Sequence, residues 1–329
     1  MRRFKGLLVV AMACALALAF ATSAFAAGVA IDLPDAGYLS GTTKIDLPSQ
    51  PEWAEVRSIS NGQVLVAFGG DLLHTHTINS PFVWGVAPNV ENPGLKGLLS
   101  TNYGEDVSAH PMSASMALSR PVAEFGFEMS PWWIPGPMDV TVTFTNTQSG
   151  QVVGTVTRKI LGSSGNCGAR LFAIRSDVLF DRIDVSASYP LAPGNYGFLM
   201  SQVRYALAPT NVTKPGLTPR QPEKCRWTSF NAWLSPEAAA AGGRAKLTLS
   251  HLETKTVRKL VRGHMRRVKI KYWRVHDSVL MSIDPANGRL STRRKLPHEG
   301  SWRAQVSFTP AASSSYLSST SQTREFTVE

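Results

Sequence analysis

The sequence is poor in cysteine, in charged residues and in long apolar runs. It holds 3 cysteines in 329 residues, and one of them, Cys14, lies in the apolar N-terminal stretch. Charged side chains make up 17% of the chain. After residue 27 no apolar segment is long enough to form a transmembrane helix. We therefore expect neither a cysteine-rich scaffold nor a membrane span after the N-terminal stretch.

Signatures of catalytic and phosphate-binding sites are also missing. The sequence has no Gly-x-Ser-x-Gly elbow, no metalloprotease helix motif and no glycine-rich phosphate loop. Glu124 and Glu128 are the obvious candidates for a glycosidase acid pair. On one strand, however, four residues at about 3.3 Å each separate them by roughly 13 Å, more than either glycosidase class uses. We predict no catalytic residue, and we expect both glutamates to be solvent-side neighbours of the buried Phe125 and Phe127.

Metal ligands are sparse in the sequence. His74 and His76 would share one face of a strand, a spacing that can chelate a metal. No third ligand has an obvious position, although His110 is available, so a polar strand face or loop is the favoured interpretation. We predict no metal and no cofactor, except that the sequence leaves a structural calcium open through the carboxylates Asp32, Asp35 and Asp46.

The first 27 residues have the pattern of a secretory signal peptide. Arg2, Arg3 and Lys5 precede an apolar core, and Ala24-Phe25-Ala26 supplies the small residues that signal peptidase requires. We therefore predict a secreted protein that is extracellular or associated with the cell surface. In that oxidising compartment we expect Cys167 and Cys225 to form a disulfide, and the alternative is two free thiols.

Charge divides the rest of the chain into two parts of opposite sign. Residues 28–205 carry 10 Lys and Arg against 15 Asp and Glu, a net charge of −5. Residues 206–329 carry 21 Lys and Arg against 8 Asp and Glu, a net charge of +13. This asymmetry indicates two modules. Residues 206–224 contain four prolines and little apolar content, so we expect a semi-rigid linker there and a second domain over 225–329.

Both modules have the period-two alternation of half-buried antiparallel strands. Over 139–145, Val140, Val142 and Phe144 alternate with threonines. Turn residues recur every 8–12 residues or so, as in sandwiches and barrels. Pro236–Ala241 is the one helix-friendly run, so the predicted fold class is all-β. The alternation continues over 267–273, where we expect three side chains to point inward, Val268, Ile270 and Tyr272.

Two groups of strand motifs resemble known families. The motifs at 124–128, 140–144, 168–173, 180–183 and 202–205 resemble jelly-roll domains of secreted bacterial proteins with PEP-CTERM sorting tails, although that tail is absent here. The motifs at 294–297, 300–303, 316, 318–321 and 324–328 are similar to bacterial immunoglobulin-like repeats. The resemblances imply a jelly-roll β-sandwich over 28–205, followed by a smaller immunoglobulin-like β-sandwich that serves as a spacer or adhesive unit.

Aromatic and basic side chains are the predicted ligand-binding groups. Aromatic rings in irregular stretches can stack on sugar rings, and the alternative is that they cap the ends of the sandwich. The candidates are Trp84, Tyr103, Trp132 and Trp133. A dense basic segment can meet phosphates or carboxylates of a polyanion, and the alternative is a solvated face. Its predicted binding residues are Arg258, Lys259, Arg262, Arg266, Arg267, Lys269 and Lys271, between Lys255 and Arg274.

These features predict a non-catalytic binding or structural protein of the cell envelope. The first domain would contact a glycan or another surface protein, and the second would adhere to an anionic envelope polymer or act as a spacer. Nucleic acid is not expected as a partner, because export removes the chain from the genome. Two alternatives remain open. One is an extracellular polysaccharide hydrolase with a basic anchoring module, and the other is a purely structural module of a surface assembly.

Overall fold

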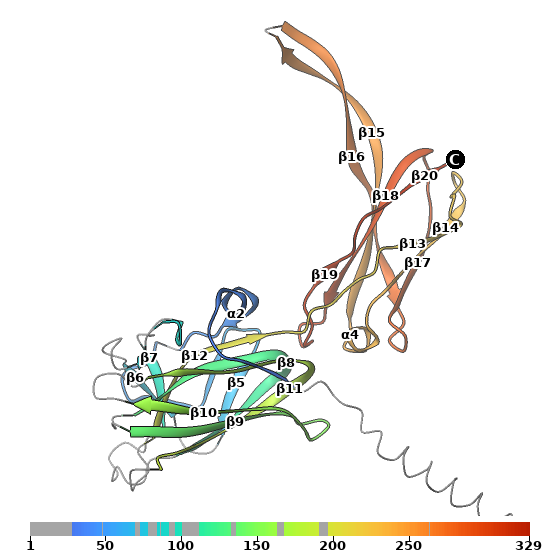
Figure 1. Ribbon diagram of the computed structural model, residues 1–329. Coiled ribbons are helices and arrows are strands. Elements are labelled where there is room, and N and C mark those ends of the chain that lie inside the picture. The colour runs from blue at the N-terminus through green and yellow to red at the C-terminus, as the bar shows by residue number, and fades with distance from the viewer. Residues whose placement is uncertain are drawn as a thin grey trace, which may run out of the picture. The chain divides into compact units, whose positions relative to one another are not determined.

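The computed structural model describes residues 28–47, 49–69, 73–77, 84–85, 87–91, 96–100, 112–132, 136–162, 168–190, 197–262 and 264–329 (Figure 1). The fold is all-β, as the alternation predicts, with two large antiparallel sheets. The chain divides into two compact units. Among the described residues, those within Met1–Ile59, Val66–Ala117 and Ala123–Tyr205 form unit 1, and those within Ser60–Leu65, Leu118–Val122 and Ala206–Glu329 form unit 2.

The first sheet has the strand order β10-β9-β11-β8-β12-β7-β6-β3. Its longest strands, β8 (Ser113–Pro131) and β11 (Arg170–Ser188), lie next to each other. Outside this order, β1 pairs with β11, β2 with β12, and β5 with both β4 and β8. The other strands are β1 (Val29–Ile31), β2 (Thr43–Lys44), β3 (Glu55–Val56), β4 (Ser58–Ser60), β5 (Leu65–Gly69), β6 (Leu73–Thr77), β7 (Lys96–Ser100), β9 (Gly136–Asn146), β10 (Gln151–Gly162) and β12 (Phe198–Ala206).

Strand β8 is buried on both faces from Glu124 to Pro131. On one face Phe127 packs against Phe125 and stacks on Phe172 of β11, with ring centroids 6.1 Å apart. The other face is approached by Tyr38 of the short helix α2 (Ala36–Gly41), because a Cβ on Gly126 would lie only 2.6 Å from the Tyr38 hydroxyl. Alternation alone predicts that one face of β8 is exposed to solvent, but α2 covers that face, so both faces are buried.

The second sheet has the strand order β13-β14-β17-β16-β15-β18-β19, and β20 pairs with β18. One face carries the core of unit 2, in which Phe230, Leu247, Trp302 and Phe308 are fully buried. The elements are β13 (Gly216–Thr218), β14 (Trp227–Trp233), α4 (Pro236–Ala240), β15 (Gly243–Val261), β16 (His264–Ile283), β17 (Arg289–Lys295), β18 (Gly300–Pro310), β19 (Ser319–Thr320) and β20 (Arg324–Val328).

The proline-rich segment 206–224 is part of unit 2, where we expected a linker. Its strand β13 pairs with β14, with Leu217 opposite Phe230. Val212 and Leu217 are both buried in the core of unit 2. Two isolated apolar residues among prolines leave no periodic pattern, so only the tertiary packing reveals that this segment is anchored.

Strands β15 and β16 extend past the rest of the second sheet as a two-stranded ribbon, which we call the arm, residues 252–274 (Figure 1). The pairing of β15 with β18 ends at His251, and that of β16 with β17 covers only Ser282 and Ile283. Within the described strands, those of the arm therefore pair only with each other. The expectation that Val268, Ile270 and Tyr272 point into a core is wrong, because Ile270 is 41% and Tyr272 is 36% exposed and Val268 is only half-buried.

Candidate functional site

The arm carries the basic segment that the sequence singles out. All seven predicted binding residues are exposed, as are Lys255 and Arg274 at its base. The arm has a single acidic residue, Glu253. Its carboxylate accepts a hydrogen bond from the Tyr272 hydroxyl at 2.8 Å and lies 3.5 Å from Arg274. The one negative charge is thus engaged at the base, away from the cations near the tip.

Cations oppose each other directly across the two strands near the tip of the arm. Arg258 pairs in register with Arg267, and Lys259 pairs with Arg266. Directly opposed residues of an antiparallel pair share a face, so one like-charge pair lies on each face of the ribbon. In such a pair the charges repel and destabilise the strands. Among the described residues no carboxylate forms an ion pair with any of the four.

A second basic surface, which the sequence analysis missed, lies on the solvent face of β14 and β17. Thr228, Phe230 and Ala232 point into the core, so Trp227, Ser229, Asn231 and Trp233 point outward. Trp227 is 54% and Trp233 is 46% exposed. The register places Lys295 opposite Trp227, Arg293 opposite Ser229, and Arg289 opposite Trp233. Alternating cations of β17 therefore share this face with two tryptophans.

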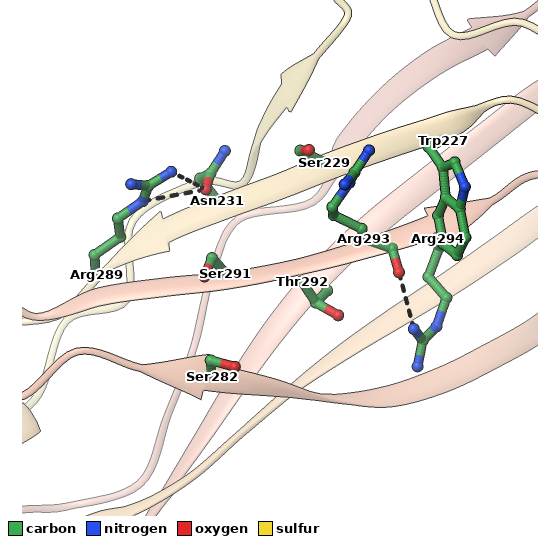
Figure 2. Close-up of a pocket in the computed structure, with 9 residues that line it drawn as sticks. All are labelled: Trp227, Ser229, Asn231, Ser282, Arg289, Ser291, Thr292, Arg293 and Arg294. Atoms are coloured by element: carbon green, nitrogen blue, oxygen red, sulfur yellow. Dashed lines mark hydrogen bonds between the residues drawn. The ribbon is translucent and has the colours of Figure 1, made fainter.

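Part of this face forms an open groove of about 550 Å³ (Figure 2). Figure 2 shows Arg289 and Asn231 at one end and Trp227 at the other, with Ser229 and Ser291 between them. The Arg289 guanidinium donates to Asn231 Oδ1 from Nε at 3.3 Å and from Nη2 at 2.9 Å. The Trp227 ring lies 5.5 Å from Arg293 Cζ and 5.2 Å from Lys295 Nζ, which are cation–π distances.

Of the tryptophans predicted to bind a ligand, those that the structure describes are engaged within unit 1. Trp84 is fully buried, so the prediction that its ring is available to a ligand is wrong. Trp132 is half-buried and packs edge-on against His76, with ring centroids 4.4 Å apart. This contact agrees with the alternative that such rings cap the sandwich. Tyr103 and Trp133 lie outside the described residues.

Glu124 and Glu128 are buried, which corrects the expectation that both face solvent. Glu124 is 3% exposed and Glu128 is 1% exposed. Arg175 Nε donates to Glu124 Oε2 at 2.6 Å. Glu128 accepts from Trp84 Nε1 at 2.8 Å and from the backbone N–H of Glu91. Burial raises the pKa of Glu128 to about 7, and these two hydrogen bonds oppose the rise. Both carboxylates are therefore buried hydrogen-bond acceptors for other groups of unit 1.

Three of the candidates for a metal site, His76, Asp32 and Asp35, have protein partners. His76 Nδ1 lies 2.6 Å from Glu52, and burial lowers the pKa of His76. Asp32 pairs with Arg158 at 2.8 Å, and Asp35 caps α2 by accepting from the Tyr38 N–H. The residues that the structure describes include no group of three or more His, Cys, Asp or Glu that could hold a metal. His110 lies outside them.

The predicted disulfide stays a prediction. Cys225 is exposed just before β14 and forms no disulfide with another described residue, and its backbone has a positive φ of 58°. Cys167 lies outside the described residues, as does the predicted signal peptide. No helix in the described part of the chain is long and apolar enough to cross a membrane.

Comparisons with known proteins show no family. No model of a known protein family matches the sequence, and no curated protein does. Among solved structures, the enzymatically active domain of bacteriophage CBA120 tailspike protein 4 has a TM-score of 0.25 at 14% identity, covering 46% of this chain and 21% of that one. The tandem CBM22-1–CBM22-2 domain of Paenibacillus barcinonensis Xyn10C has a TM-score of 0.25 at 12% identity, covering 93% and 91%. The glycoside hydrolase domain Endo-D of Streptococcus pneumoniae R6 has a TM-score of 0.24 at 10% identity, covering 87% and 42%.

At TM-scores of this size the likenesses carry no inference about fold or function. The chain spans less than half of the length of the tailspike and Endo-D chains that it matches. The resemblances to jelly-roll domains of PEP-CTERM proteins and to immunoglobulin-like repeats remain predictions from the sequence.

Proposed function

We propose that the protein is an exported, non-catalytic binding protein of the cell envelope, and that the arm of unit 2 adheres to an anionic polymer. One observation carries this proposal: the two directly opposed like-charge pairs near the tip, Arg258 with Arg267 and Lys259 with Arg266. These pairs cost the isolated ribbon stability. A polyanion that runs along either face would neutralise the repulsion and release its own counterions.

The shape of the arm suits a long, flexible partner better than a compact one. Its two strands present exposed cations on both faces. A row such as Arg267, Lys269 and Lys271 spaces charges by about 6.6 Å along one face. This arrangement supports contact with successive charges of a polymer. The buried Glu124 and Glu128 give no support to the alternative of a polysaccharide hydrolase.

The test is binding of the chain from residue 28 onward to poly(glycerol phosphate) at low and high ionic strength. We expect salt-sensitive binding, and the double variant Arg258→Glu/Arg267→Glu should weaken it about tenfold or more at low salt. The control is Lys214→Glu/Arg220→Glu, which changes the net charge equally at exposed positions of unit 2 outside the arm. It should retain most of the binding.

Two results would contradict the proposal. Equal losses in both double variants would show that net charge, and not the arm, decides binding. Absence of binding by the unmodified chain at every ionic strength would favour the spacer role or the purely structural module.

A further inference from the structure

The groove on β14 and β17 combines a half-exposed tryptophan with cations and small hydroxyl groups. Of its three arginines, Arg294 pairs with Asp277, whereas Arg289 and Arg293 form no ion pair with a described residue. We propose that it is a binding site for a polysaccharide whose sugars carry anionic groups, and that it is separate from the arm. The inference does not rest on the role proposed for the arm, because it uses other residues of unit 2.

Trp227 supplies the stacking surface. Its side chain is 54% exposed although its neighbours on the strand, Thr228 and Phe230, are fully buried. An indole is a rigid, largely apolar plate with a polar N–H at its edge, which suits a sugar ring with one apolar face and a rim of hydroxyls. An inorganic anion has no apolar face that could stack on the indole.

The cations next to the ring supply the charge selectivity. Arg293 Cζ, in the groove, and Lys295 Nζ, beside it, lie over the ring at 5.5 Å and 5.2 Å from its centroid. An acidic group of a sugar that packs against the exposed part of the ring would therefore lie within reach of both cations. Planar guanidinium groups bind carboxylates and similar oxyanions through paired hydrogen bonds. Neither Arg293 nor Lys295 forms an ion pair with a described residue. No described residue that lines the groove is acidic.

The opposite end of the groove supplies a third point of contact. Arg289 is oriented there by the neutral amide of Asn231, so its positive charge is positioned but not neutralised. Trp227 and Asn231 are four residues apart on one strand, about 13 Å. That span fits several linked sugars better than a single ring. Between the ends, the hydroxyls of Ser229 and Ser291 can hydrogen-bond sugar hydroxyls (Figure 2).

The experiment measures affinity for polygalacturonate, for its fully methyl-esterified form, for dextran sulfate and for inorganic polyphosphate. It uses the chain from residue 28 onward, both unmodified and with the Arg258→Glu/Arg267→Glu arm variant, so that failure of the arm and failure of the groove are distinguishable. The acidic sugars should bind at least about tenfold more tightly than the methyl ester. Comparing polygalacturonate with dextran sulfate tells carboxylated from sulfated chains.

Substitutions locate the site. Trp227→Ala should weaken binding of the acidic polysaccharide about tenfold and change binding of polyphosphate less than twofold. The matched control is Trp233→Ala, which removes an exposed tryptophan from the same face of the same strand but outside the groove. It should retain the affinity. Arg293→Met should reduce the preference for polygalacturonate over its methyl ester.

Three results would overturn the proposal. The first is an equal loss in Trp227→Ala and Trp233→Ala. The second is an unchanged affinity of Trp227→Ala for the acidic polysaccharide, in a variant whose cooperative unfolding shows that it is folded. The third is equal affinity of the unmodified chain for polygalacturonate and its methyl ester, which would remove the role of the cations.

Discussion

The indole Nε1 of Trp84 donates a hydrogen bond of 2.8 Å to the Glu128 carboxylate, and both side chains are buried in unit 1. A residue expected to bind sugar and a residue considered for catalysis thus hold each other inside the fold. The backbone N–H of Glu91 donates to the other carboxylate oxygen. These two hydrogen bonds offset only part of the free-energy cost of removing the Glu128 carboxylate from water. The free energy of unfolding therefore depends on whether Glu128 is protonated.

Glu128→Gln should flatten the dependence of stability on pH. Burial raises the folded-state pKa of Glu128 from 4.5 to about 7. The folded state therefore holds this proton more tightly, and the stabilisation is present below pH 4.5 and lost as the pH rises through the folded pKa. The loss is on the order of 3 kcal/mol. Urea unfolding across this range should show a fall in the wild type that is much reduced in the variant, and parallel profiles would refute the assignment.

Arg204→Met should destabilise the protein far more than Arg182→Met. Arg204 forms two hydrogen bonds of 2.8 Å with Glu91, and the two side chains are 11% and 18% exposed. Removing the guanidinium leaves a largely buried carboxylate without its main partner, which costs roughly 3 kcal/mol or more. The Arg182–Asp184 pair is exposed, so its loss should cost little. Chemical unfolding at neutral pH measures both, and similar costs would contradict this ranking.

Acid should shrink the effect of Arg204→Met. The hydrogen bonds from Arg204 are the largest cause of the lowered pKa of Glu91. A lowered folded-state pKa means that the stabilisation is present above the ordinary pKa and is lost as the pH falls through the folded value. The difference between wild type and Arg204→Met should therefore be largest at neutral pH. A difference that stays constant on acidification would show that the substitution acts through packing.

Gly126→Ala should be strongly destabilising, whereas Gly41→Ala should not. A Cβ on Gly126 would lie 2.3 Å from the Cβ of Ala173 and 2.6 Å from the Tyr38 hydroxyl, so α2 must shift or the sheet must distort. Overpacking of this kind costs about 1–3 kcal/mol or more. At Gly41, the last residue of α2, nothing lies within 4 Å of a Cβ. Thermal unfolding of the two variants tests whether Tyr38 rests on β8 as closely as the structure shows.

Phe230→Ala and Trp227→Ala should separate the two faces of β14. Phe230 is fully buried in the core of unit 2, so truncating it should cost about 3–5 kcal/mol. Trp227 is more than half exposed on the opposite face, so its truncation should change stability by less than about 1 kcal/mol. The unfolding free energies of both variants decide the matter. A large loss for Trp227→Ala would mean that this ring is structural, and would weaken its assignment as a ligand platform.

Local alternation was a reliable guide wherever a single core lies beneath a strand. Val140, Val142 and Phe144 are buried on one face of β9 as predicted, and Pro236–Ala240 forms the short helix α4. The same rule failed for the arm, where the residues alternate as in a half-buried strand but, in the described part of the chain, β15 and β16 pair only with each other, and Ile270 and Tyr272 are exposed. It also failed for Glu124 and Glu128, because cover on both faces of β8 depends on segments distant in sequence.

The composition and order of residues were sufficient to predict an all-β fold and the concentration of basic residues within 255–274, since both depend on neighbours along the chain. Only the tertiary packing determined which faces of the strands are buried. That packing buried Trp84 and Glu128 together, anchored 206–224 through β13, and turned Trp227 outward beside Arg293 and Lys295. The physical reason is that burial and charge compensation depend on groups brought together from remote parts of the chain, and strand periodicity says nothing of them.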